Sequence, residues 1–161
     1  MSPVQSGSRG MYFEEYEVGL QVITAGRTVT ESDVVSFAGL SGDFNQIHTD
    51  AEYSKQSLFG QRVAHGMLVL SIVTGLAVQT GILEGTVLAF REIAEWKFSK
   101  PVFLGDTIHA IMEVVETKPM SRLGGGSVLI KIVVKNQHSD TVMRGDLSFL
   151  VALKPQESPS G

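Results

Sequence analysis

The spacing of apolar side chains singles out residues 67–79 as the most hydrophobic segment of the chain. Apolar residues stand on almost every side of a helix drawn through this segment, which is typical of a helix buried around most of its circumference. Small side chains within it would let neighbouring elements approach closely, and these are Ser71, Thr74, Gly75 and Ala77. The pattern therefore predicts a long, closely packed central helix.

Ahead of this helix, the pattern predicts one strand and a second helix. Residues 20–30 are rich in β-branched side chains, which favour strands. Thr30 and Asp33 have the spacing of a capping box, so a helix should cover residues 31–40 and end at Gly42. The apolar residues of that helix expected to face inward are Val34, Phe37, Ala38 and Leu40.

The second half of the chain has the pattern of long strands separated by turns. Turns are predicted at Pro101, at Gly105 and Asp106, and in a glycine-rich bend at residues 122–126. The predicted strands cover residues 86–98, 107–117, 127–136 and 141–153. One buried helix followed by long antiparallel strands predicts an α+β fold, with a strongly curved sheet wrapped around the helix.

The composition is that of one globular domain with a hydrophobic core. The chain has 161 residues, of which 43% are hydrophobic and 19% are charged, and these values exclude a disordered protein. We expect a single domain at residues 11–154, with disordered tails at residues 1–10 and 155–161.

Charge, cysteine content and hydropathy exclude several functions. The net charge of −4 offers no basic face for nucleic acid. The absence of cysteine excludes disulfides, zinc–thiolate sites and a cysteine nucleophile, and it fits the reducing cytoplasm. The longest apolar stretch falls short of the ~20 residues that span a bilayer, and the N-terminal residues lack the apolar core of a secretion signal. We therefore expect a cytoplasmic protein without nucleic-acid or membrane partners.

The loop at residues 41–50 combines apolar and polar side chains in a short space. Phe44 and Ile47 would anchor this loop to the core. Asp50 at its end is a typical N-cap for a short helix over residues 51–56. A loop anchored in this way would leave its polar side chains free to face a pocket.

Three of these polar side chains could carry out acid–base chemistry. Asp43 and His48 are a carboxylate and an imidazole five residues apart, and Asn45 stands between them. Adding water to a double bond conjugated to a carbonyl requires a base, an acid and donors for the enolate oxygen, and Asp and His can supply the first two. The same residue types are common in ordinary turns and at surfaces, and this segment alone leaves both interpretations open.

A second signal lies at the start of the central helix, where His65 and Gly66 lead into it. The N–H groups of a helix's first turn lack intrahelical partners, and with the positive end of the helix dipole they can bind an anionic oxygen. Glycine lets that oxygen approach without a Cβ in the way. A simple helix start is the alternative interpretation.

Three motifs, taken in their order along the chain, resemble the MaoC-like hydratase family, which includes the (R)-specific enoyl-CoA hydratases. They are Asp43-Phe44-Asn45-Gln46-Ile47-His48, His65-Gly66-Met67 and Pro101-Val102-Phe103-Leu104-Gly105-Asp106. The resemblance covers roughly residues 12–154. It implies a hot-dog fold, in which an antiparallel curved sheet wraps around the long central helix.

The same resemblance implies the reaction and the residues that perform it. Asp43 and His48 would activate water, and the N–H of Gly66 would bind the thioester oxygen of an acyl-CoA. The implied activity interconverts a trans-2-enoyl-CoA and an (R)-3-hydroxyacyl-CoA, without a cofactor or a metal ion.

Further residues would bind the substrate or support the site by the same resemblance. Asn45 would hold the loop, and His65 and Thr74 would lie beside the substrate. Two positions depart from the family pattern, since Gln46 replaces a proline and Thr74 replaces a serine. Apart from the resemblance, the cations that are candidates for binding the CoA phosphates are Arg91, Lys97, Lys100 and Arg122, although each taken singly is more typical of a solvated surface charge.

Two other functions compete with the hydratase. A hot-dog acyl-CoA thioesterase is one, but many of these enzymes place an acidic residue on the central helix, and residues 67–79 contain none. A non-catalytic acyl-CoA-binding domain is the other, but such a domain has no need of Asp43 beside His48.

A homodimer is the predicted minimum assembly. One sheet wrapped on one helix leaves long edges that invite pairing, and residues 127–136 are apolar enough to be covered on both faces. In the family that the chain resembles, two hot-dog protomers place their sheets side by side, with the active sites at the interface.

Overall fold

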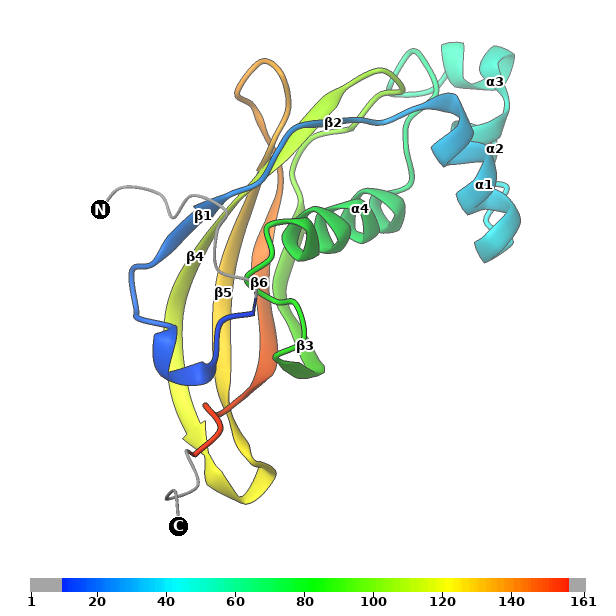
Figure 1. Cartoon of the computed structure of the whole chain (residues 1–161). Helices are drawn as coiled ribbons and strands as arrows, with labels where there is room; N and C mark the ends of the chain where they lie inside the picture. Colours follow the sequence, from blue (N-terminus) through cyan, green and yellow to red (C-terminus); the bar gives the residue numbers. More distant parts are fainter. Residues whose placement is uncertain (1–9, 157–161) are drawn as a thin grey trace.

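The protein is built around one antiparallel sheet that curves past a single long helix (Figure 1). The computed structural model describes residues 10–156, so most of the tails predicted at residues 1–10 and 155–161 lies outside the described residues. The strand order is β1-β4-β5-β6-β3, and β2 pairs with β4. The strands are β1 (Gln21–Ile23), β2 (Arg27–Thr28), β3 (Val87–Phe98), β4 (Thr107–Met120), β5 (Gly125–Lys135) and β6 (Thr141–Ala152).

Helix α4 (Gly66–Gln79) lies against the inner face of this sheet and supplies the centre of the core (Figure 1). Its buried side chains are Leu68, Val69, Leu70, Ile72, Val73, Leu76 and Ala77. Most belong to one hydrophobic cluster with inward side chains of the strands, such as Ile108, Ile132 and Leu147. An antiparallel sheet wrapped around one helix confirms the predicted α+β hot-dog fold.

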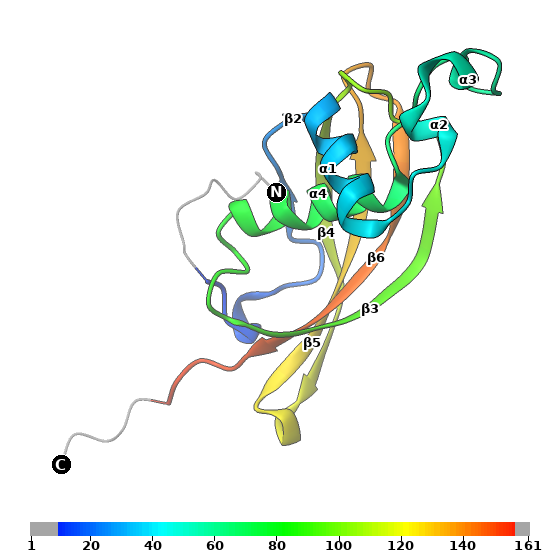
Figure 2. The ribbon, with the colours of Figure 1, turned by 90° about the vertical axis from the view of Figure 1, so that its right-hand side faces the viewer.

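One stripe of α4 stays exposed, which corrects the prediction of a helix that is closely packed on nearly every side. Met67 and Val78 are each 54% exposed, and Ser71 and Gly75 lie between them on the same stripe and are also exposed. A Cβ added to Gly75 would meet no heavy atom within 4 Å. The sheet covers one side of α4 and a second helix covers another, so the third side has no neighbour among residues 10–156 (Figure 2).

That second helix, α1 (Glu31–Ser41), confirms the predicted capping box. The Thr30 hydroxyl accepts the Asp33 N–H at 3.2 Å, and the Asp33 carboxylate accepts the Thr30 N–H at 2.9 Å. The helix ends where Gly42 adopts a left-handed φ of 77°, as predicted for that glycine.

Only a narrow stripe of α1 faces the core. Val34 and Ala38 are buried, and Phe37 packs against the core from a half-buried position. Leu40, which was also expected to face inward, is 85% exposed. The reason is that α1 lies over α4 and not on the sheet itself (Figure 2).

The strand predicted at residues 20–30 is divided into β1 and β2. The Thr24 N–H donates to the Ala110 carbonyl at 3.0 Å, and the Thr24 hydroxyl accepts the Ala110 N–H at 2.9 Å. A side chain thus replaces a backbone carbonyl in the ladder with β4, and the regular pairing is interrupted there.

The remaining elements lie close to their predicted positions. Helix α3 (Ala51–Lys55) has Asp50 as its predicted N-cap. Strand β5 alternates buried and half-exposed side chains, so within one chain the expected coverage of both its faces is absent. No helix in residues 10–156 is both long enough and apolar enough to cross a membrane.

Candidate active site

The loop between α1 and α4 contains a one-turn helix, α2 (Gln46–Thr49), that the sequence pattern does not predict. Two short side chains begin it. The Asp43 carboxylate accepts the Asn45 N–H at 3.2 Å, and the Asn45 side-chain oxygen accepts the Ile47 N–H at 3.2 Å. Asn45 is therefore the N-cap of α2.

His48 lies in α2, and its ring is fixed by its neighbours. Its Nδ1 is 2.6 Å from the carbonyl oxygen of Val63. Because a carbonyl can only accept, Nδ1 carries the proton, and Nε2 of the neutral ring keeps a free lone pair. His48 is 8% exposed and Asp43 is exposed, so a buried imidazole lies beside a carboxylate that solvent reaches.

His65 connects this loop to the start of α4. Its ring stacks on that of His48 with centroids 3.8 Å apart and planes inclined by 28°. Its Nε2 donates to the backbone carbonyl of Asp43 at 2.9 Å. His65 is 2% exposed, and no partner for its Nδ1 is found among the described residues. Its observed contacts therefore hold Asp43 and His48 against the helix.

The surroundings of His48 favour a neutral imidazole. Burial lowers the pKa of His48 below its usual value, and the nearby His65 lowers it further. The hydrogen bond to Val63 and the charge of Asp43 raise the pKa, but they do not offset the burial. A neutral ring with a free Nε2 is the form that can accept a proton near pH 7.

Metal binding fits these three side chains poorly. Asp43, His48 and His65 each offer one ligand-type atom, and these atoms lie within 4.8 Å of one another. A metal ion must lie close to the plane of each imidazole that binds it, and two rings stacked at 3.8 Å share no such point nearby. The arrangement is better suited to proton transfer.

A cavity of about 580 Å³ lies beside His48 and Gly66, both of which line it. Its other walls are mostly apolar and include Ile47, Leu58, Phe59, Met67, Phe98 and Val102. Gly66 is the first residue of α4, and a Cβ added to it would lie 2.7 Å from the Phe98 ring. The predicted oxyanion-binding glycine therefore stands where an apolar pocket meets the helix N-terminus.

The structure separates other predicted residues from this cavity. The Thr74 hydroxyl donates to the Ser71 carbonyl at 2.7 Å inside α4, and none of its hydrogen bonds reaches Asp43 or His48. Phe44 was expected to anchor the loop, but it is 61% exposed, and Ile47 alone of the pair reaches the cavity wall. The loop is held instead by hydrogen bonds to its backbone.

The four cations proposed for the CoA phosphates are widely dispersed. Lys100 lines the cavity and pairs with Asp140 at 2.6 Å. Arg91 lines a different cavity, with residues of β4 to β6. Lys97 and Arg122 are exposed and line neither cavity. Of these four, Lys100 alone is placed to meet a ligand in the cavity beside His48.

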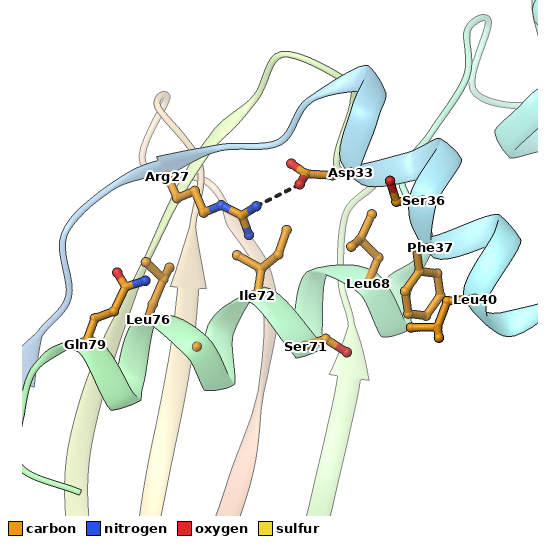
Figure 3. A pocket seen from close by; sticks show the side chains of 11 residues that line it. Arg27, Asp33, Ser36, Phe37, Leu40, Leu68, Ser71, Ile72, Leu76 and Gln79 are labelled. Carbon is orange, nitrogen blue, oxygen red and sulfur yellow. Dashed lines mark hydrogen bonds and ion pairs between the residues drawn. The ribbon is translucent and has the colours of Figure 1, made fainter. Parts of the chain in front are cut away.

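A second groove, of about 360 Å³, runs between α1 and α4 (Figure 3). Phe37, Leu40 and Ile72 line it, and an ion pair between Arg27 and Asp33, 2.7 Å long, lies above Ile72, between the Gln79 and Leu40 ends of the groove. His48 and Gly66 both line the cavity described above but not this groove, and Asp43 lines neither. The cavity beside His48 is therefore the better candidate for the site of reaction.

Arg62 is an unpredicted participant in the loop. Its Nε donates to the His48 carbonyl at 2.6 Å, and its two terminal nitrogens donate to the Glu31 carboxylate at 2.9 and 2.8 Å. The sequence pattern offers no signal for this role, since a single arginine in a polar loop is typical of a solvated surface charge.

Comparison with known proteins decides the family of this fold and site. The family described as "MaoC like domain" matches residues 15–136. The chain belongs to the MaoC-like domain family. It is 33% identical over 108 residues to an (R)-specific enoyl-CoA hydratase of Rhodospirillum rubrum, an alignment that covers 67% of this chain and 72% of that protein.

Two further relatives of this MaoC-like domain differ in length. Protein MaoC of Klebsiella aerogenes is 42% identical over 97 residues, which are 60% of this chain but only 28% of that protein. The solved structure of the monoamine oxidase regulatory protein from Archaeoglobus fulgidus is 39% identical, with a TM-score of 0.85, and the match covers 94% of this chain and 100% of the other. The family and its hot-dog fold are thus the ones that the three sequence motifs imply.

Proposed function

We propose that this MaoC-like domain is a hydratase that adds water reversibly to a trans-2-enoyl-CoA to give the (R)-3-hydroxyacyl-CoA. The observation that carries the proposal is the fixed ring of His48, which lies beside Asp43 and lines a cavity that Gly66 also lines. The (R)-specific hydratase of Rhodospirillum rubrum supports this choice of reaction.

In the direction of hydration, water is the nucleophile and C3 of the enoyl group is its target. Nε2 of His48 accepts a proton from a water oriented by Asp43 while the oxygen bonds to C3. Electrons move onto the thioester oxygen, where the N–H of Gly66 and the positive end of α4 stabilise the enolate. The dyad then returns the proton to C2, so that the elements of one water are added and no cofactor is consumed.

The proposal assigns supporting roles to three further residues. Asn45 keeps α2 in place, and His65 holds the Asp43 loop on the helix start. Lys100 would meet the anionic part of CoA at the mouth of the cavity.

The proposed active unit is a homodimer joined along β3. This strand is at the edge of the sheet, and among the described strands it pairs only with β6. It exposes the large apolar side chains of Leu88, Phe90, Ile93 and Phe98, which are 43–55% exposed. Exposed apolar edge strands favour pairing with another strand, and a second copy of β3 would cover them.

The direct test follows the enone absorbance of crotonyl-CoA after enzyme is added. Asp43→Asn and His48→Ala should each lower kcat by about 100-fold or more, the scale of a lost acid–base group. His138→Ala is the matched control, because His138 is exposed in the turn between β5 and β6.

Three results would contradict the proposal. The first is a near-normal rate in both the Asp43→Asn and the His48→Ala variants. The second is release of free thiol from an acyl-CoA without loss of the enone, which would identify a thioesterase. The third is binding of acyl-CoA with neither reaction, which would identify a non-catalytic domain.

A further inference from the structure

Residues 62 and 63 hold His48 by both its backbone and its ring. The Val63 N–H donates to the Ile47 carbonyl at 3.1 Å, and the Val63 carbonyl accepts from His48 Nδ1 at 2.6 Å. The Arg62 Nε completes the set by donating to the His48 carbonyl at 2.6 Å. Only the last of these bonds is made by a side chain of the segment, so it can be removed by substitution.

Helix α2 depends on such external donors. It has four residues, and a helix of one turn is not stable in isolation because nucleation costs more than its few hydrogen bonds return. Its last carbonyls have no intrahelical partner. The Arg62 guanidinium donates a hydrogen bond to one of these carbonyls, that of His48, and so caps the C-terminal end of α2.

The guanidinium is itself held in one orientation. Both of its terminal nitrogens donate to the two carboxylate oxygens of Glu31, in the parallel geometry that arginine and carboxylate favour. The Arg62 side chain is 18% exposed, whereas that of Glu31 is 61% exposed. A planar cation anchored at one edge presents its Nε at a fixed place, which a flexible lysine would not do.

We infer that Arg62, oriented by Glu31, is a positioning residue for the proposed base His48. It acts through the backbone of α2, keeping the imidazole where Val63 fixes its Nδ1–H form and where the ring lines the cavity. The inference rests on the proposed function for its kinetic consequences, although the hold on the His48 ring exists whatever the reaction is.

The kinetic test compares Arg62→Met with the wild-type protein. We expect kcat to fall about 10-fold or more, the scale of a slightly misplaced catalytic group, with KM changed less than about 3-fold. Arg62→Lys keeps the cation, but its side chain can reach only Glu31 or the His48 carbonyl and not both. Its kcat should therefore lie between that of the wild type and that of Arg62→Met. Arg27→Gln is the matched control, because Arg27 also pairs with a carboxylate of α1, at 2.7 Å from Asp33, but does not touch His48.

A double substitution separates positioning from a merely structural role. If Arg62 acts through His48, then Arg62→Met should lower kcat no further when it is added to His48→Ala. An additional fall of the same size in that background would overturn the inference, and so would a wild-type kcat in Arg62→Met. Should Arg62→Met fail to fold, Glu31→Gln provides the same comparison from an exposed position, with an expected loss of about 3-fold.

A spectroscopic measurement tests the inference without any activity. Nitrogen NMR of histidine-labelled protein reports which ring nitrogen bears the proton. His48 should be in the Nδ1–H form in the wild type and in Arg27→Gln, and a mixture of both forms in Arg62→Met. An unchanged tautomer in Arg62→Met would refute the positioning role, whereas a changed tautomer in a protein without hydratase activity would refute only the proposed function.

Discussion

The buried imidazole of His48 makes the proposed activity dependent on pH in a defined direction. Burial and the neighbouring His65 lower its pKa below the ordinary value of about 6.5. The protonated ring cannot accept a proton, so kcat/KM should stay level near neutrality and fall only as the pH drops below that value. Measuring kcat/KM from about pH 5 to 8 checks this, and an acid limb at or above the ordinary pKa of histidine would show that His48 is not the base.

The same shift links protonation to stability. The folded state binds a proton at His48 less readily than the unfolded state does, because the pKa is lower in the folded state. The free energy of unfolding is therefore not reduced by protonation of His48 above about pH 6.5, where the ring is neutral in both states. It decreases as the pH falls from there toward and through the lowered pKa.

Gly66 is the residue at which a single methyl group should be most harmful to catalysis. In Gly66→Ala, the new Cβ would lie 2.7 Å from the Phe98 ring, which lines the cavity and must move. We expect kcat to fall about 10-fold or more because the N–H of residue 66 and the cavity wall are both displaced. Steady-state kinetics with crotonyl-CoA measures this loss.

Gly75→Ala is the matched control for that substitution. Gly75 lies in the same helix with no atom within 4 Å of an added Cβ. It should keep the wild-type rate and gain roughly 0.5–1 kcal/mol of unfolding free energy, because alanine favours the helix. Equal rates in the two variants would contradict the role proposed for Gly66.

Residue types and spacing predicted part of this site for definite physical reasons. The sequence places a carboxylate and an imidazole in one short loop, and the order of the motifs connects that loop with the start of the central helix. In the structure, one ligand-type atom each of Asp43, His48 and His65 lie within 4.8 Å of one another. Arg62 could not be found in this way, because its role depends on a carbonyl and on a carboxylate 31 positions away in the chain. Thr74 was expected at the site, but its hydroxyl is used within its own helix.

Among the elements, α1 positions two parts of the proposed site, because it begins with Glu31, which binds Arg62, and leads into the loop that contains Asp43. Thr30→Ala removes one arm of its capping box and should lower the unfolding free energy by about 1 kcal/mol. Urea denaturation measures the change. Thr30→Ser keeps the hydroxyl and should behave as the wild type, so equal stability of the Ala and Ser variants would show that the cap contributes nothing.

Elements with strong local signals were predictable, and those determined by tertiary contacts were not. The capping box, the left-handed Gly42 and the apolar run of α4 are local, and α1 and α4 begin and end within about one residue of prediction. Helix α2 has only four residues, too few for a periodic pattern of apolar positions to be recognised. Two of its carbonyls accept hydrogen bonds from residues 62 and 63, which follow it in the chain. The break between β1 and β2 depends on Thr24 meeting Ala110 across the sheet.

At the scale of the whole molecule, the exposed edge of β3 predicts assembly. The wild type should have twice the protomer mass of 17.4 kDa in light scattering. Leu88→Lys should shift it toward the monomer and reduce activity, because a charged side chain would have to be buried where a second copy of β3 covers this apolar edge. Leu123→Lys is the matched control, since Leu123 is 52% and Leu88 is 53% exposed but Leu123 lies outside β3. A fully active wild-type monomer would contradict the dimer.

The length of α1 is constrained from both of its ends. Glu31 holds Arg62 at the first turn, and the backbone of Asp43, just past the last turn, is bound by His65. One inserted residue would rotate everything after it by about 100° and advance it by about 1.5 Å, so the two attachments could not both survive. The bend at Ser121–Leu123 closes the β4–β5 hairpin at the far end of the sheet (Figure 1) and bears no such constraint. Insertions and deletions that arise as this chain evolves should therefore accumulate at that hairpin and be eliminated from α1, so that its number of residues is inherited as strictly as the side chains of the site.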